Sequence, residues 1–343
     1  MLASPPLTIG IPVYNGSRYV AEAIEASLGQ TGVDVEVVVA DNASTDDTPQ
    51  ICRDHAARDP RVRYVRFEEH LGVAGSYSRT FGLCRSEFFK WAASDDLFAP
   101  TYGRAALSAL HKHPEAVLAY SEAQVVDSRG EFVRKDDFML ELSGVPATTR
   151  FRRLIMAPPK HHGAHEQYGV IRSAALRRTG LMSTHVYGDR VLLAQLSLLG
   201  EFVRLPVVLF SNREHDGRSQ RAGRQRHRPG SVFTRRLGAG PWPPSEFWDP
   251  RRTGRIVFPE WDIAGQYVKA AMQSDLSPED KAKAVAAVGA MVAYRSPKYG
   301  RDVLVAAEQA TRLALLGEAP WRGGLDRHFG ERPSAASETS AGG

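Results

Sequence analysis

The sequence predicts an α/β protein with a mostly parallel central sheet flanked by helices, followed by a largely helical C-terminal extension. Between residues 7 and 120, short β-branched runs alternate with amphipathic helical segments, as they do in consecutive βαβ units. Residues 35–40 form a nearly uninterrupted apolar run, which is typical of a central parallel strand covered on both faces. The chain has 343 residues, 43% of them hydrophobic and 24% charged, so it is long enough to bury one large core or two smaller ones.

The expected elements follow in order along the chain. A helix begins at Thr48, because threonine is a good capping residue and Pro49 fits the first helical position. The other elements expected in the first half are strands at 7–13, 35–40, 62–67 and 88–92 and helices at 19–28 and 73–84. Further along we expect a helix at 102–111, a strand at 117–120, a hairpin around 127–130, a strand at 168–171, a helix at 189–199 and helices between 263 and 316.

Two segments have no clear helical or strand period. Residues 212–260 are rich in Arg, Gly, Pro and Trp, and we expect a long loop or lid there. The residues after 332 are small and polar, which predicts a disordered tail.

Composition narrows the class of protein. No window reaches the roughly 18 uncharged apolar residues of a membrane-spanning helix, and residues 1–6 lack the layout of a signal peptide, so we expect a cytoplasmic protein. The only cysteines, Cys52 and Cys84, are too few for a disulfide framework. The net charge of +5 and an excess of arginine between 204 and 255 favour a polyanionic ligand, which leaves a diphosphate, a nucleic acid or an acidic membrane face open.

Polar residues follow three of the expected strands. They are the pairs Tyr14-Asn15, Asp41-Asn42 and Asp95-Asp96. Ligands of open α/β sheets bind where the carboxyl ends of parallel strands meet, so these residues mark the expected site. Two adjacent carboxylates in a cleft need a positive partner, and Mg²⁺ or Mn²⁺ bridging to phosphate oxygens provides one. Neither a phosphate-binding loop nor a dinucleotide-binding glycine pattern occurs in the sequence, which disfavours those nucleotide-binding classes.

Four segments together resemble glycosyltransferase family 2, the inverting enzymes with a GT-A fold. They are residues 11–15 (IPVYN), 39–46 (VADNASTD), 70–75 (HLGVAG) and 90–96 (KWAASDD), and the resemblance extends from residue 7 to about 215. It implies a nucleotide-sugar-binding half at 1–120, an acceptor-binding half of the same domain at 121–215, a lid and helical extension at 216–330 and a tail at 331–343.

The resemblance also implies roles for single residues. Pro12 and Tyr14 would line the base pocket, and Asp41 would accept a hydrogen bond from the base. Asp95 would contact the ribose or sugar and share the metal, whereas Asp96 would be the main metal ligand. The remaining residues expected around the nucleotide are Asn15, Asn42, Gly72 and Arg79.

The transfer chemistry points to a second group of residues. Inversion requires a general base on the acceptor side, and the position that matches the base of relatives is Asp189, which could equally cap the helix expected at 189–199. The segment 210–215 resembles the part of the family that closes over the diphosphate. By this likeness His215 would complete the metal shell, and Arg213 or Arg218 would neutralise the leaving group.

The function predicted is a metal-dependent, hexosyl-type transferase that uses a nucleotide diphosphate sugar, expected to be UDP-linked. Its acceptor is left open among small molecules, lipid-linked carriers and glycans, with at most peripheral membrane contact and a possible homodimer. A nucleotidyltransferase or nucleotide-sugar hydrolase on a similar sheet is the first alternative. A basic nucleic-acid-binding module is the second, and it is disfavoured because aromatic residues are sparse in the arginine-rich segment before Trp242.

Overall fold

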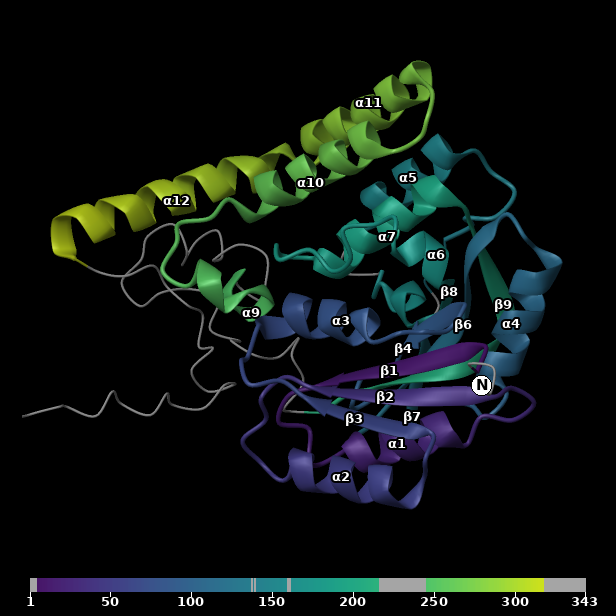
Figure 1. The fold of residues 1–343 in the computed structure, drawn as a ribbon. Coiled ribbons are helices and arrows are strands. Elements are labelled where there is room, and N and C mark those ends of the chain that lie inside the picture. Colours follow the sequence, from purple (N-terminus) through teal and green to yellow (C-terminus); the bar gives the residue numbers. More distant parts are fainter. Residues whose placement is uncertain (1–4, 137, 139, 159–161, 216–244, 318–343) are drawn as a thin grey trace, which may run out of the picture.

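The computed structural model describes residues 5–136, 138, 140–158, 162–215 and 245–317. In this part of the chain, one mixed sheet runs in the order β3-β2-β1-β4-β8-β6-β9-β5, with β7 paired to β6. Helices cover both faces, and a further helical layer stands on one side (Figure 1). The expected fold class is therefore confirmed.

The first four strands are parallel and form the half of the sheet that positions the site. They are β3 (Val62–Arg66), β2 (Val35–Asp41), β1 (Leu7–Val13) and β4 (Phe88–Trp91). Every residue of β1 is buried, as expected of a strand covered on both faces. Val13 at the end of β1 pairs with Asp41 at the end of β2, so the loops that follow these strands emerge side by side.

The second half of the sheet is mixed. Its strands are β5 (Leu97–Phe98), β6 (Ala116–Val126), β7 (Phe132–Asp136), β8 (Val170–Arg172) and β9 (Glu201–Arg213). β8 is antiparallel to β4 and β6, whereas β9 is parallel to β6. The hairpin expected around 127–130 is confirmed as the turn between β6 and β7.

β9 was not expected from the sequence. It contains Pro206, which cannot donate a ladder hydrogen bond, and prolines inside strands are confined to edges and irregular positions. The register of β9 with β6 shifts at this point, since Ser121 pairs with Leu205 and Glu122 with Val208. The strand continues past this irregularity and carries Arg213 to the edge where the acidic pair lies.

Each face of the sheet has its own core. On one face α1 (Val20–Leu28), α2 (Thr48–Arg58) and α4 (Tyr102–Lys112) pack against apolar residues of β1, β2 and β3. On the other face the core includes Phe89, Trp91 and Ile171. The helices of this second face are α3 (Gly72–Gly82), α5 (Ala147–Met156), α6 (Ser173–Leu176) and α7 (Gly188–Leu199), and a 3-10 turn, η1 (His165–Tyr168), precedes β8.

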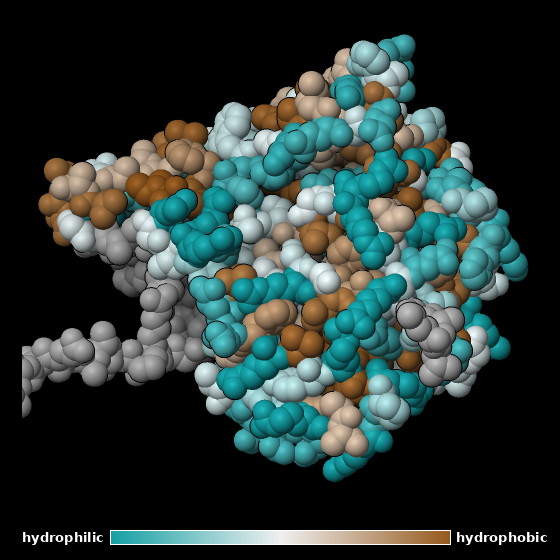
Figure 2. All heavy atoms as spheres, in the orientation of Figure 1, coloured by the Kyte–Doolittle hydropathy of each residue, from teal (hydrophilic) through white to brown (hydrophobic). Residues whose placement is uncertain are grey.

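The extension adds a third helical layer. α10 (Pro259–Gln273) and α11 (Pro278–Tyr294) pack on α5 and α7, with Tyr267 and Met291 buried between them. α12 (Ser296–Leu316) projects beyond this layer, and its last turns expose Leu315 and Leu316. Figure 2 shows the apolar surface over this end of the helix. Among the described residues, no helix is both long and apolar enough to cross a bilayer.

Helices expected between 263 and 316 are thus confirmed. Most of the expected lid, 216–244, and the expected tail, 331–343, lie outside the described residues. The downstream part of the expected loop contains two short elements, α9 (Ser245–Trp248) and η3 (Pro250–Arg252). The division of the chain into a donor half and an acceptor half stays a prediction.

Candidate active site

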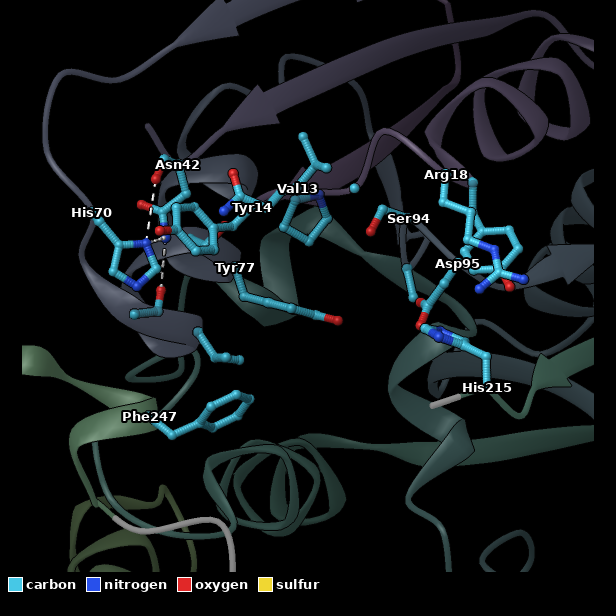
Figure 3. Close-up of a pocket in the computed structure, with 18 residues that line it drawn as sticks. Val13, Tyr14, Arg18, Asn42, His70, Tyr77, Ser94, Asp95, His215 and Phe247 are labelled. Atoms are coloured by element: carbon cyan, nitrogen blue, oxygen red, sulfur yellow. Dashed lines mark hydrogen bonds and ion pairs between the residues drawn. The ribbon is translucent and has the colours of Figure 1, made fainter. Parts of the chain in front are cut away.

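A cleft of about 380 Å³ opens at the carboxyl edge of β1, β2 and β4. The structure brings seven of the expected site residues into its lining: Pro12, Tyr14, Asn15, Asn42, Gly72, Asp95 and His215. Figure 3 shows two ends of this cleft. Tyr14, Asn42 and His70 lie at one end, and Arg18, Asp95 and His215 lie at the other.

The loops after β1 and β2 are tied to each other. Asn15 and Ala43 both adopt the left-handed backbone region, with φ of 49° and 67°, which non-glycine residues adopt only when their surroundings compensate the strain. The compensation is visible in two hydrogen bonds. The Asn15 amide donates to Oγ of Ser44 (2.9 Å), and the Thr45 amide donates to Oδ1 of Asn15 (2.8 Å). Asn15 therefore shapes the rim of the cleft.

The aromatic end of the cleft is held by Asn42. Its side-chain amide donates to the carbonyl of Gly72 (3.2 Å) and lies 3.1 Å from Nδ1 of His70, while its Oδ1 accepts from the Leu71 amide (3.1 Å). The ring of His70 lies 4.1 Å from that of Tyr14, centroid to centroid. Burial lowers the pKa of His70, so this imidazole is neutral near pH 7. The two rings form an uncharged surface suited to a planar base.

Asp41 is placed differently from its expected role. Its side chain is fully buried and is not part of the cleft lining. Oδ2 accepts a hydrogen bond from the hydroxyl of Tyr64 (2.7 Å), and Oδ1 accepts one from the Ser44 amide (2.8 Å). Asp41 thus fixes the loop after β2, and Asn42, the next residue, is the one that faces the cleft.

The two carboxylates of the acidic pair also point to different places. The Asp95 side chain is 28% exposed, and its Oδ2 lies 2.9 Å from Nε2 of His215 in the cleft. Asp96 is buried and is not part of the lining. Its Oδ1 accepts from the Arg213 amide (2.8 Å), and the Asn212 side chain donates to both of its oxygens (3.2 Å each). One carboxylate faces the ligand space, and the other anchors the end of β9.

A buried lysine lies behind this pair. The ammonium group of Lys90, on β4, donates to the carbonyl of Tyr168 and lies 4.6 Å from the ring of Phe98 and 4.4 Å from that of Tyr102. Burial lowers the pKa of Lys90 to about 7, although the negative charge of Asp96 acts in the opposite direction. The Lys90 ammonium thus interacts electrostatically with Asp96, the buried member of the acidic pair.

Two of the expected basic residues, Arg213 and Arg79, are not part of the cleft lining. Arg213 is buried, and its guanidinium donates to the Asp95 carbonyl (2.9 Å) and the Ser128 carbonyl (3.1 Å) and pairs with Glu22 (2.6 Å). Arg79, in the last turn of α3, donates to the carbonyl of Glu69 (3.1 Å). Arg218 lies outside the described residues.

Arg18 is a basic residue of the cleft that the sequence did not single out. It is exposed and lines the cleft, and Figure 3 shows it beside Asp95 and His215. Its guanidinium packs 4.9 Å above the ring of Tyr19 and forms no ion pair with any described residue. The only available signal was its position three residues after Asn15, in the loop after β1.

Asp189 lies in the first turn of α7 and is half-buried. Burial raises the pKa of its carboxyl group, and the positive charge of Arg190 and a hydrogen bond from the Arg190 amide (2.8 Å) offset part of this rise. Burial also raises the pKa of Tyr77, with smaller contributions from the charges of Asp95, Asp96 and Asp189. Tyr77 lines the cleft, whereas Asp189 is not part of the lining.

The described residues contain no group of three or more His, Cys, Asp or Glu side chains able to hold a metal ion by themselves. The pair formed by Asp95 and His215 offers one carboxylate oxygen and one imidazole nitrogen, both facing the cleft. This donor set fits an ion that takes its remaining ligands from a bound phosphate group and water. Asp96, whose oxygens are hydrogen-bonded to β9, does not face that position.

Arginines of the basic segment that are described form local ion pairs. Arg204 pairs with Glu122 (2.8 Å), and Arg252 pairs with Asp262 (2.9 Å). Arg251 pairs with Asp249 (2.9 Å). These three arginines are thus paired with acidic neighbours, whereas seven of the twelve arginines between 204 and 255 lie outside the described residues.

A family model described as "Glycosyl transferase family 2" matches residues 8–180. Among curated relatives, chondroitin synthase of Escherichia coli is 32% identical over 129 residues, which cover 38% of this chain and 19% of that protein. The succinoglycan biosynthesis protein ExoO of Rhizobium meliloti is 36% identical over 96 residues, 28% of this chain and 27% of that protein. The chain thus spans less than half of the length of these relatives.

The fold is also found among solved structures. S. aureus TarS 1-349 in complex with UDP-GlcNAc superposes with a TM-score of 0.57 at 17% identity, over 83% of this chain and 72% of that one. The complex of the same protein with UDP gives a TM-score of 0.54 at 15% identity, over 82% and 69%. The fold is of the GT-A class, and the family match covers half of the sequence with the expected motifs inside it. The chain therefore belongs to glycosyl transferase family 2.

Proposed function

We propose that this glycosyltransferase moves a sugar from a UDP-linked donor to a glycan hydroxyl, with inversion at the anomeric carbon. The proposal rests on one observation: the two ends of the cleft differ in charge. An aromatic, uncharged end at Tyr14 and His70 is joined to a charged end at Arg18, Asp95 and His215, which matches a nucleoside linked to a diphosphate.

The donor and acceptor classes have further support. TarS, whose fold the chain shares, was solved with UDP and with UDP-GlcNAc, so UDP is the first nucleotide to test. The names of the sequence relatives refer to chondroitin and succinoglycan, and a glycan acceptor is proposed for this reason.

The charged end would hold the diphosphate together with Mg²⁺ or Mn²⁺. Asp95 and His215 are the residues we propose as protein ligands, in place of Asp96. A divalent ion there would supply positive charge to the departing diphosphate. Arg18 would contribute a second positive charge, because Arg213 is engaged with Glu22 and backbone carbonyls.

Asp189 is the proposed general base. The acceptor oxygen attacks the anomeric carbon from the face opposite the diphosphate, its proton passes to the Asp189 carboxylate, and the bond from the anomeric carbon to the diphosphate oxygen breaks. The raised pKa of Asp189 suits this role, since a base with a pKa closer to the working pH accepts a proton more readily.

Isothermal titration with UDP tests the donor site. We expect binding in the presence of Mn²⁺ and a large loss of affinity when a chelator is added. The same binding with and without chelator would contradict the metal assignment. Release of free sugar at the same rate with and without an acceptor would instead favour a nucleotide-sugar hydrolase.

A further inference from the structure

One wall of the cleft comes from the C-terminal extension. Phe247, in α9, lines the cleft although it lies far beyond residues 8–180, which match the family. Figure 3 shows its ring on the side of the cleft opposite Tyr14 and His70, with its edge toward the open space between them. The aromatic end of the cleft is therefore bounded on two sides.

This wall is firmly attached to the family domain. Phe247 and Trp248 are 4% and 7% exposed, and they pack in one apolar cluster with Ala74 of α3 and with Met182 and Val186, which precede α7. The rings of Phe247 and Trp248 meet edge to face, 5.9 Å apart. The helix thus lies between α3 and the loop that leads to Asp189.

Gly72 allows the close approach of this segment. It has a φ of +70°, and a Cβ atom added there would lie 2.7 Å from the carbonyl oxygen of Trp248 and 2.8 Å from Cδ of Pro250. A side chain at residue 72 would push residues 248–250 away. The position of Phe247 is therefore set by backbone contact with the start of α3, at the same turn that Asn42 holds.

We propose that Phe247 packs against the nucleoside of the donor, on the side opposite Tyr14, so that the extension completes a nucleotide site that the family domain leaves open on one side. This inference rests on the proposed function, because it assigns a ligand to the same cleft. Every nucleobase has an apolar, polarisable face, and the edge of an aromatic ring that contacts this face stabilises the bound base. Phe247 carries no charge, so it contributes to the affinity for the nucleoside and not to that for the diphosphate.

The experiment compares UDP binding by the wild-type protein, Phe247→Leu and Phe258→Leu in the presence of Mn²⁺. Phe258 is the matched control, since it belongs to the same extension, is 40% exposed and is not part of the cleft lining. We expect Phe247→Leu to weaken UDP binding about tenfold, as for the loss of one contact between an aromatic ring and a base. We expect Phe258→Leu to bind UDP like the wild type. The affinity for inorganic pyrophosphate alone, measured by titration in the absence of nucleotide, should be the same for all three proteins.

Two results would overturn the inference while leaving the proposed function in place. One is wild-type affinity for UDP in Phe247→Leu. The other is an equal loss of affinity for UDP and for pyrophosphate, which would indicate a distorted cleft. A wild-type protein that binds no UDP would overturn the proposed function itself and the inference with it.

If the leucine variant does not fold, Phe247→Tyr and Phe247→Met replace it in the UDP-binding experiment. Both retain bulk in the cluster, and thermal unfolding measures whether they remain folded. The tyrosine variant keeps the ring and should bind UDP within about twofold of wild type, whereas the methionine variant should show the tenfold loss. Equal affinity in these two variants would reject a role for the aromatic ring in nucleoside binding.

Discussion

Nε2 of His215 lies 2.9 Å from Oδ2 of Asp95, although the two residues are 120 positions apart in the chain. Asp95 lies in the turn between β4 and β5, whereas His215 follows the end of β9. The contact exists because Asp96 and Arg213, the neighbours of these residues, are joined by a hydrogen bond of 2.8 Å. The buried carboxylate of Asp96 therefore helps to position the partly exposed carboxylate of Asp95, and this arrangement leads to the first prediction.

Asp95→Asn and Asp96→Asn should affect different properties of the protein: the first the metal-dependent binding of UDP, the second the stability of the fold. Asp95→Asn should abolish the Mn²⁺-dependent part of UDP affinity and leave the free energy of unfolding nearly unchanged, because the side chain is partly exposed. Asp96→Asn should lower the free energy of unfolding by about 1–3 kcal/mol, since it weakens buried hydrogen bonds to Asn212 and Arg213. Titration calorimetry and urea unfolding measure the two effects.

Loss of metal-dependent binding in a stable Asp96→Asn protein, together with normal binding in Asp95→Asn, would reverse the assignment. In that case the original expectation that Asp96 is the main metal ligand would hold.

Arg18→Ala should weaken the binding of UDP and should also reduce the transfer rate. Arg18 stands beside Asp95 and His215, where the diphosphate is proposed to lie, and forms no ion pair with a described residue that would compete for it. We expect a loss of UDP affinity of about tenfold, and a smaller loss at high salt because this arginine is exposed. Arg79→Ala is the matched control and should retain wild-type affinity, because Arg79 is not in the cleft lining. Equal effects of the two substitutions would argue against a role for Arg18.

Asp189→Asn should bind UDP like the wild type and lose the transfer reaction. The base is active only when ionised, so the rate of transfer should rise with pH as Asp189 loses its proton. Burial raises the pKa of Asp189, and the rising limb should therefore lie above the range of an ordinary aspartate. A profile of kcat against pH measures this limb, and full activity in Asp189→Asn would remove the residue from the mechanism.

Lys90→Met should change how stability depends on pH. The folded-state pKa of Lys90 is about 7, below the 10.5 of an unperturbed lysine, so the unfolded chain binds the proton more tightly. The cost of burying the charge is fully present below pH 7 and is relieved as pH rises from about 7 toward 10.5. From pH 6 to pH 9 this lysine should therefore add about 2–3 kcal/mol to the stability of the wild type.

Urea unfolding of both proteins at pH 6 and pH 9 measures this effect. We expect the wild type to gain more stability than Lys90→Met over this interval. The same gain in both proteins would show that Lys90 keeps an ordinary pKa in the folded state.

The parallel half of the sheet was predictable from local pattern. β1 and β2 are apolar runs ended by polar residues, and α2 begins at the expected Thr48. Such signals are carried by neighbouring residues, so they are visible without a structure. β9 was missed because Pro206 interrupts its pattern, and the strand is held by its long pairing with β6.

Tertiary folding decided which member of each polar pair faces the cleft. Asp41 and Asn42 are adjacent, as are Asp95 and Asp96, and sequence order alone cannot tell which one points outward. The answer depends on Tyr64, which binds Asp41, and on the end of β9, which binds Asp96. These partners come from other strands, and only their packing fixes the direction of each carboxylate.

Arg18 and Phe247 illustrate the same limit. In the sequence, Arg18 is an ordinary loop arginine, and Phe247 lies in a segment without a recognisable motif. Phe247 enters the cleft because two distant backbone segments meet, through the contact of Trp248 and Pro250 with Gly72. Composition and motifs were sufficient to identify the sheet, the family resemblance and the edge where ligands bind. The identity of the side chains that line that edge depends on long-range packing, because contacts between distant residues determine side-chain direction.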